Sequence, residues 1–173
     1  LVEVQAPYGY VLDSTPVSFD VTEENSTQEG GITLIKVDKP NMAQKGTISV
    51  EKTGEVFFGV NVSGEEDKDV IYQPVYKVKG LAGAVYEITA DEDVITPDGT
   101  LRYHKGDVVD TVTTDEDGTA KSKELYLGKY TVVETKAPTG MVINKEKHSV
   151  ELTYAGQDVA VTETATSFVN ERQ

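Results

Sequence analysis

A short pattern that occurs twice, once near each end of the chain, constrains the fold more than any other feature. Tyr130–Met141 reads as a strand-like run followed by an Ala-Pro pair and Gly140. At the start of the chain a glutamate, an Ala-Pro pair and Gly9 recur at matching intervals, with a constant offset of 131 residues between Glu3 and Glu134. Such a long period predicts a domain-sized tandem repeat. The sequence therefore contains one whole module and the end of another.

Most of the remaining sequence is patterned for β-strands. Between Thr47 and Thr53, Ile48 and Val50 alternate with polar residues, and Lys52 falls in phase with the apolar set. The lysine is therefore expected to face inward. Further strand candidates are 56–62, 70–78, 84–90, 108–114, 129–136, 147–154 and 159–169. Turn signals rich in Gly, Pro and Asp separate them, and no helix-length apolar stripe is present, so we predict an all-β, antiparallel β-sandwich with Greek-key connections.

Composition restricts the partners and the environment. The net charge of −14 disfavours binding to nucleic acid or to an anionic membrane surface, because both would repel the chain. No apolar run is long enough to span a membrane, and the first residues do not resemble a signal peptide, which predicts an excised fragment. Without cysteine the chain has neither disulfides nor a cysteine-based zinc site.

The repeat predicts the domain boundaries. Residues 1–42 correspond to the C-terminal strands of an incomplete preceding module, 43–46 to a short linker, and 47–173 to the complete module. Strands are predicted in the first part at about 2–5, 17–22 and 32–37. Because the first half of that module is missing, its strands would have open edges, and we expect a neighbouring chain to cover them. The short linker predicts a restricted joint.

The repeated pattern resembles the E-box, Tyr-x-Leu-x-Glu-Thr-x-Ala-Pro-x-Gly-Tyr, of collagen-adhesin B-type (CnaB) domains in Gram-positive pilins and surface adhesins. The matching residues are Tyr130, Glu134, Thr135, Ala137, Pro138 and Gly140. Val132 and Met141 depart from the pattern but stay apolar. The resemblance continues through 46–55, 81–88 and Phe168-Val-Asn170. It implies an immunoglobulin-like or prealbumin-like Greek-key sandwich in an extracellular protein, at the cell surface or anchored to the cell wall.

The same resemblance implies a spontaneous isopeptide bond between Lys52 and Asn170, assisted by Glu134. The residue pattern supports this, because all three side chains lie in phase with apolar neighbours and should be buried. Burial favours the neutral forms of an amine and of a carboxylic acid, which leaves a nucleophilic amine facing a carboxamide. Glu134 would polarise the carboxamide oxygen and relay protons. The alternative is a structural ion pair between Lys52 and Glu134, with Asn170 ending a strand.

The incomplete module retains Glu3 but no partner lysine in this sequence. Because Val37-Asp38 aligns with Val169-Asn170, Asp38 is the first candidate for its acceptor, and Asn41 is the second. Neither is expected to be bonded within this chain.

Two classes of function are compatible with these features. One is a structural stalk module of a cell-wall-anchored surface protein or pilus subunit, with neighbouring modules of the same protein as partners. The other is an adhesive module that binds a host protein or glycan, through an insertion at residues 56–79. No motif of a conventional enzyme or cofactor site is present. Acidic runs at 65–69 and 115–118 lack the spacing of a calcium loop and favour solvated turns.

Overall fold

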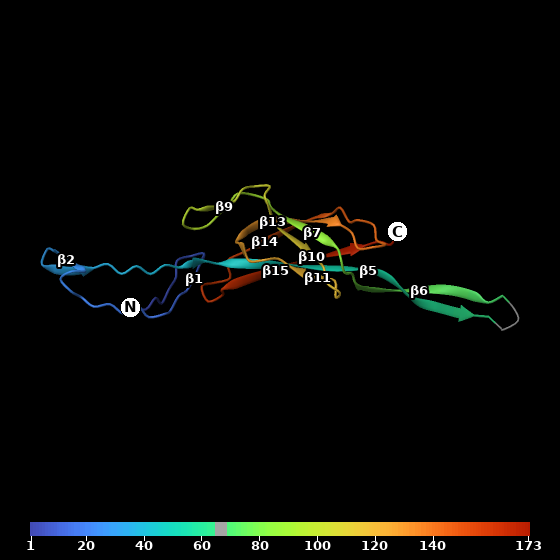
Figure 1. Cartoon of the computed structure of the whole chain (residues 1–173), viewed down its shortest axis with the longest axis horizontal. Coiled ribbons are helices and arrows are strands. Elements are labelled where there is room, and N and C mark those ends of the chain that lie inside the picture. Colours follow the sequence, from blue (N-terminus) through green and yellow to red (C-terminus); the bar gives the residue numbers. More distant parts are fainter. Residues whose placement is uncertain (65–68) are drawn as a thin grey trace.

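The computed structural model describes residues 1–64 and 69–173 and shows an elongated molecule built almost entirely from β-strands (Figure 1). The body is a sandwich of two sheets, as predicted. The four-stranded sheet has the order β10 (Val108–Thr113), β7 (Val85–Ala90), β13 (Gly128–Lys136) and β14 (Lys147–Leu152). A small hairpin, β8 (Val94–Ile95) with β9 (Leu101–Tyr103), lies outside both sheets.

The five-stranded sheet is organised around one long strand, β5 (Lys45–Ser63). The strands β12 (Leu125–Tyr126), β11 (Thr119–Lys121) and β6 (Ile71–Gly80) pair antiparallel with successive stretches of β5, and β15 (Val161–Asn170) pairs with residues 45–54. The β5–β15 pairing is parallel, whereas the other pairs in the described residues are antiparallel. The first and last strands of the module therefore run side by side in the same direction.

The core lies between the two sheets and follows from the alternation in the sequence. Ile48 and Val50 of β5 are fully buried, while the intervening Ser49 and Glu51 face outward. Tyr86 and Ile88 of β7 close the core from the opposite sheet. Because both sheets contribute one apolar face, the core between them is mainly apolar, and the fully buried charged side chain of Lys52 is exceptional there.

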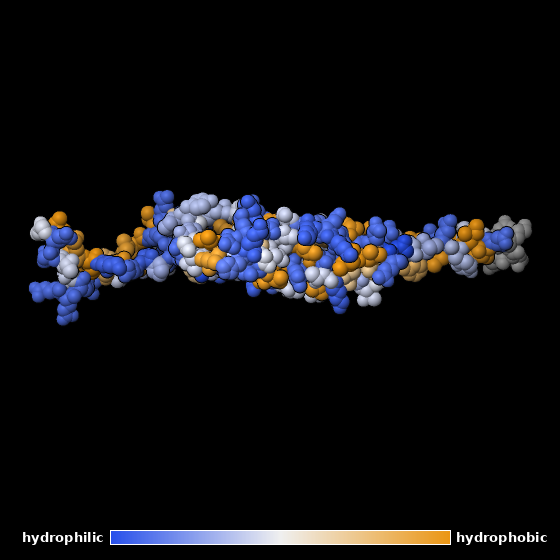
Figure 2. All heavy atoms as spheres, turned by 90° about the horizontal axis from the view of Figure 1, so that it is seen from above, coloured by the Kyte–Doolittle hydropathy of each residue, from blue (hydrophilic) through white to orange (hydrophobic). Residues whose placement is uncertain are grey.

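The region predicted as an insertion contains both strands predicted there: 56–62 continues β5, and 70–78 corresponds to β6. Residues 53–63 pair with β6 to form a two-stranded ribbon that extends beyond the body, with an irregularity between Phe57 and Gly59 (Figure 1). Figure 2 shows apolar side chains at the surface along this ribbon. The exposed large apolar residues of the ribbon are Phe57, Phe58, Val60, Val62, Ile71, Tyr72 and Val78. The acidic run at 65–69 falls mainly on residues 65–68, outside the described residues.

The N-terminal segment contains less regular structure than predicted. A two-residue pair, β1 (Tyr10–Val11) with β4 (Met42–Ala43), and a hairpin of β2 (Ser26–Glu29) with β3 (Ile32–Ile35) are its only named strands among the described residues. The strands predicted at 2–5 and 17–22 are wrong: Leu1 and Val17 exchange two backbone hydrogen bonds of 2.9 Å, and no ladder forms. Neither segment has a neighbouring strand to pair with in the described residues.

The junction between the two parts is shorter than the predicted linker. Ala43 ends β4 and Lys45 begins β5, so Gln44 alone connects them. In the part of the chain that the structure describes, no helix is long and apolar enough to cross a membrane.

Candidate site of side-chain cross-linking

The structure brings Lys52, Glu134 and Asn170 together inside the core. Lys52 lies on β5, Asn170 is the last residue of β15, and Glu134 reaches across from β13 in the opposite sheet. The exposed fraction is 0% for Lys52, 2% for Glu134 and 3% for Asn170. The parallel register explains the meeting of two of them, because Lys52 lies opposite Phe168, two residues before Asn170. Three polar side chains from three strands thus share one water-poor site.

The contacts among the three groups are direct. The Lys52 ammonium nitrogen, Nζ, is in hydrogen-bonding contact with Oδ1 of Asn170 and lies 3.3 Å from Oε1 of Glu134. The Asn170 amide nitrogen, Nδ2, donates to both Glu134 oxygens, at 3.1 and 3.0 Å. Glu134 therefore faces the amine of the lysine and the amide nitrogen of the asparagine, whereas the amide oxygen faces the lysine. The predicted contact between Glu134 and the amide oxygen is not present.

Further donors fix the Glu134 carboxylate. The Tyr86 hydroxyl donates to Oε1 at 3.3 Å, and the Asn144 backbone N–H donates to Oε2 at 2.6 Å. Together with Lys52 and Asn170, these donors hold both Glu134 oxygens in a fixed orientation.

The surroundings of Lys52 favour its neutral amine. Burial lowers the pKa of Lys52 below its ordinary value of 10.5, while the charge and hydrogen bond of Glu134 act in the opposite direction. The centroid of the Phe168 ring lies 5.8 Å from Nζ; this ring stacks on His148 at 3.9 Å and contacts the tilted ring of Tyr86 at 4.8 Å. Burial also raises the pKa of Tyr86, which therefore remains a protonated hydrogen-bond donor.

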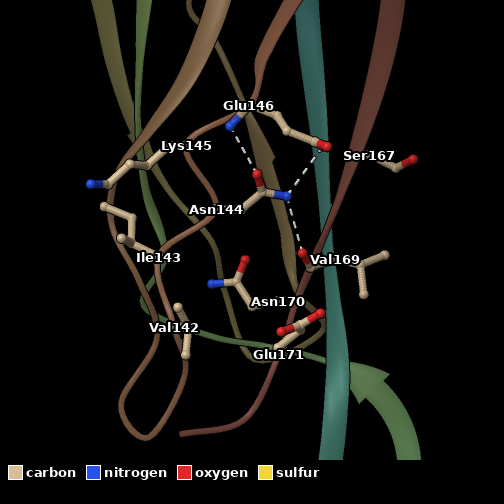
Figure 3. Close-up of a pocket in the computed structure, with 9 residues that line it drawn as sticks. All are labelled: Val142, Ile143, Asn144, Lys145, Glu146, Ser167, Val169, Asn170 and Glu171. Atoms are coloured by element: carbon tan, nitrogen blue, oxygen red, sulfur yellow. Dashed lines mark hydrogen bonds between the residues drawn. The ribbon is translucent and has the colours of Figure 1, made fainter.

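A cleft of about 470 Å³ borders this site (Figure 3). Its walls are the loop 142–146 and the end of β15, and Asn170 forms part of its lining. Figure 3 shows Asn144 between the two walls, where its side chain donates to Val169 O at 3.1 Å and accepts from the Glu146 backbone N–H at 2.9 Å. The sequence analysis missed Asn144, because its role depends on the conformation of a loop without a recognisable motif. Within residues 1–64 and 69–173, no cluster of three or more candidate metal ligands occurs.

Residues 1–42, predicted to be the end of a preceding module, contain a carboxylate–asparagine pair of the same kind. The Asn41 side chain donates to Glu3 Oε2 at 2.7 Å, and the Asp13 backbone N–H donates to the same oxygen at 3.1 Å. These contacts repeat those of Asn170 and Asn144 with Glu134. Asp38, the first candidate from the sequence, instead pairs with Lys36 at 3.1 Å and is largely exposed. The structure thus places the second candidate, Asn41, beside Glu3.

With this geometry established, comparison with known proteins identifies the family. Residues 74–166, more than half of the chain, match the SpaA prealbumin-like fold domain. The chain therefore belongs to the SpaA prealbumin-like domain family.

Several solved structures are similar to this chain. The Bacillus anthracis TIE protein is 25% identical with a TM-score of 0.50, and the match covers 99% of this chain and 24% of that protein. The major pilin SpaD of Corynebacterium diphtheriae is 21% identical, with a TM-score of 0.47 and coverage of 75% and 30%. A variant of BcpA, the major pilin subunit of Bacillus cereus, is 22% identical, with a TM-score of 0.43 and coverage of 75% and 30%. The chain thus spans less than a third of each of these proteins. No curated protein matches its sequence.

Proposed function

We propose that this chain is a load-bearing stalk segment of a Gram-positive cell-surface protein or pilus subunit, in which Lys52 and Asn170 join spontaneously through an isopeptide bond. The observation that carries the proposal is the burial of an amine, a carboxamide and a carboxylate in mutual contact, on the first and last strands of the module and on a strand facing them. Membership of the SpaA family supports the surface location.

The reaction requires no cofactor. Neutral Nζ of Lys52 attacks Cγ of Asn170, and Oε1 of Glu134, 3.3 Å away, takes a proton from the attacking nitrogen. Oε1 then passes the proton to Nδ2 of Asn170, which lies 3.1 Å away. The Cγ–Nδ2 bond breaks, ammonia leaves, and a secondary amide joins the two side chains. The cleft beside Asn170 offers the ammonia an exit.

The position of this bond would give the module its mechanical role. Force applied at Lys45 and at the end of β15 would shear two parallel strands, which are otherwise held by backbone hydrogen bonds. A link from Lys52 to Asn170 would carry the load across 118 sequence positions, bypassing the rest of the module. The sandwich could then remain folded under tension.

Intact mass spectrometry of the folded chain tests this proposal. The chain should be lighter than its sequence mass by one ammonia, and digestion should yield a branched Lys52–Asn170 peptide. Lys52→Ala and Asn170→Ala should each abolish the loss, and Glu134→Ala should block or greatly slow it. Glu3→Ala is the matched control and should retain the loss. A folded wild-type chain with its full sequence mass would refute the bond.

Adhesion is a second candidate, favoured by the exposed apolar side chains of the β5–β6 ribbon. Residues 56–63 pair only with 71–77 within the described chain, so replacing 56–79 by a short turn would leave the sandwich ladders intact. Binding of the complete and shortened chains to panels of matrix proteins and glycans tests this function. Adhesion requires a ligand that binds the complete chain and is lost with the ribbon.

A further inference from the structure

The end of the incomplete module is docked onto the complete module by a specific set of contacts. The turn at Gly9 lies against Pro97: a Cβ at Gly9 would meet Pro97 Cγ at 2.6 Å. Tyr8 packs on Tyr154 with ring centroids 4.6 Å apart. The Ala6 backbone N–H donates to the Gln157 side chain at 2.8 Å. The turn is therefore held against the complete module by side-chain packing and a hydrogen bond, and not by the chain connection alone.

Gln44 holds this joint together. Its backbone N–H donates to Gly9 O at 2.8 Å, which fixes it to the turn of the preceding module. Its side chain reaches into the complete module, where Nε2 donates to Gly156 O at 2.8 Å and Oε1 accepts from the Ala155 N–H at 2.8 Å. Gln44 is only 1% exposed. Gln44 thus forms hydrogen bonds to both modules, through its backbone N–H to one and through the nitrogen and the oxygen of its side-chain amide to the other.

At the opposite end of the complete module, the last residues make the same backbone contacts with the Gly140 turn that residues 43 and 44 make with the Gly9 turn. The Gln173 backbone N–H donates to Gly140 O at 3.1 Å, as Gln44 does to Gly9. Met141 pairs with Arg172, as Tyr10 pairs with Ala43. Both glycines have positive φ, +86° at Gly9 and +79° at Gly140. The C-terminal end therefore has the same backbone framework as the docked turn.

The two ends differ in burial. Gln173 is exposed, and its side chain folds back to donate to Met141 O at 3.3 Å. Gly140 is exposed, and a Cβ there would meet nothing within 4 Å. The turn at Gly9 and Gln44 therefore packs against the complete module, whereas the equivalent Gly140 and Gln173 are exposed.

We propose that the Gly140 turn and Gln173 form a docking surface for a second module of this kind, with Gln173 in the role of Gln44. The occupant follows from the joint already present in the chain, whose receiving residues, Pro97, Ala155 and Gln157, belong to the same type of module. Thr139 stands where Tyr8 stands at the first joint, so the second joint lacks the ring contact.

The base of the ribbon lies next to this surface. Arg172, next to Gln173, pairs with Glu55 at 3.5 Å and lies 3.5 Å over the Tyr76 ring at the base of the ribbon. Figure 1 shows that the ribbon continues beyond the C-terminus along the long axis. A docked module would therefore lie beside its exposed apolar side chains. The inference deepens the proposed stalk function but does not require the Lys52–Asn170 bond.

The test is a tandem chain in which a second copy of residues 45–173 follows Gln173 directly, so that Gln173 occupies the position of Gln44. Residue-resolved amide hydrogen exchange is compared with that of the chain 1–173. The Ala137 amide should become as protected as the Ala6 amide is at the first joint. The Ala155 amide of the second copy should become as protected as the Ala155 amide of the first copy. Gln173→Ala should speed exchange of the second-copy Ala155 amide by about tenfold or more.

Two further variants keep the outcome decisive. Gln44→Ala in the chain 1–173 should expose the Ala155 amide by a similar factor, which calibrates the readout. Gly140→Ala in the tandem should weaken the second joint more than it perturbs the chain 1–173, because the added methyl would meet Pro97 of the next copy. Unprotected Ala137 and Ala155 amides in a folded tandem would overturn the inference. The mass of the same tandem reports the isopeptide bonds separately, as a loss of two ammonia molecules.

Discussion

Two carboxylate–asparagine pairs in the described residues, Glu3 with Asn41 and Glu134 with Asn170, share their contacts with a backbone N–H but differ in burial and in contact with a lysine. Glu3 with Asn41 repeats the contacts of Glu134 with Asn170, including a backbone N–H from Asp13 or Asn144 to the carboxylate. Two segments, the E-box turn and the end of the last strand, are therefore enough to assemble this half of the site.

The second half requires a complete sandwich. Glu134 and Asn170 are buried by both sheets, whereas Glu3 and Asn41 are only partly buried. In the complete sandwich, Lys52 of β5 joins the pair, and burial lowers the pKa of its amine. The comparison indicates that a carboxylate and an asparagine can meet when only partly buried, whereas the buried lysine requires both sheets.

The largest expected effect comes from removing the carboxylate of the complete site. Glu134→Ala should leave Lys52 and Asn170 unlinked and so release a loop of 118 positions in the unfolded chain. By analogy with a disulfide closing a loop of about 100 residues, the loss of stability is at most about 4.7 kcal/mol. Thermal unfolding should then occur on the order of 20 °C lower. Calorimetry and limited proteolysis measure the change.

Glu3→Ala is the matched change in the incomplete pair. It removes the same type of carboxylate but no link, so the melting temperature of the complete module should stay within a few degrees of the wild type. Equal destabilisation by the two substitutions would show that the carboxylates act only as hydrogen-bond acceptors, and the contrast between the two sites would fail.

A smaller effect is expected from the titration of the unlinked lysine. In Asn170→Ala, Lys52 remains buried with its pKa lowered by desolvation. Between that pKa and 10.5 the unfolded chain holds a proton that the folded chain does not, so the free energy of unfolding rises with pH in this window. The slope is at most about 1.4 kcal/mol per pH unit. Urea unfolding between neutral and alkaline pH measures it.

The control for this titration is Lys52→Met in the same Asn170→Ala background, which keeps the other titrating groups. The upward trend should be absent from the double variant. A single variant whose stability changes with pH in the same way as that of the double variant would mean that Lys52 keeps an ordinary pKa, and that burial does not prepare the amine.

The sandwich was predictable because alternation sets which side chains face the core, and β5 from Ile48 to Lys52 follows that rule. Asn41, the second candidate, contacts Glu3, whereas Asp38, the first, does not, and there is a physical reason for this difference. Local similarity aligned Val37-Asp38 with Val169-Asn170, but the β1–β4 pairing shifts the register by three residues and brings Asn41 to Glu3.

Other features depended on contacts that a linear pattern does not contain. Strands were predicted at 56–62 and 70–78, but the pattern did not show that the first of them continues β5 through the irregularity at Phe57 to Gly59 and pairs with β6. Gln44 lies in a segment that was predicted as a simple linker, and its importance follows from carbonyl groups more than 100 positions away. Parallel pairing of the first and last strands also depends on the whole fold.

The smallest effect should come from Asn41→Ala. The substitution removes the hydrogen bonds to Glu3 Oε2 at 2.7 Å and to Val11 O at 3.1 Å, each of which contributes about 1 kcal/mol locally. The short β1–β4 pair should loosen, and hydrogen exchange at Asp13, whose N–H also contacts Glu3, should accelerate. Melting of the complete module should be almost unchanged, because none of its core contacts is lost.

The intact mass should still show the loss of one ammonia, and the wild type should show no second loss from Asn41. A cross-linked peptide containing Asn41 in the wild-type chain would contradict the comparison, since it would mean that the incomplete pair reacts without the core that the complete site requires.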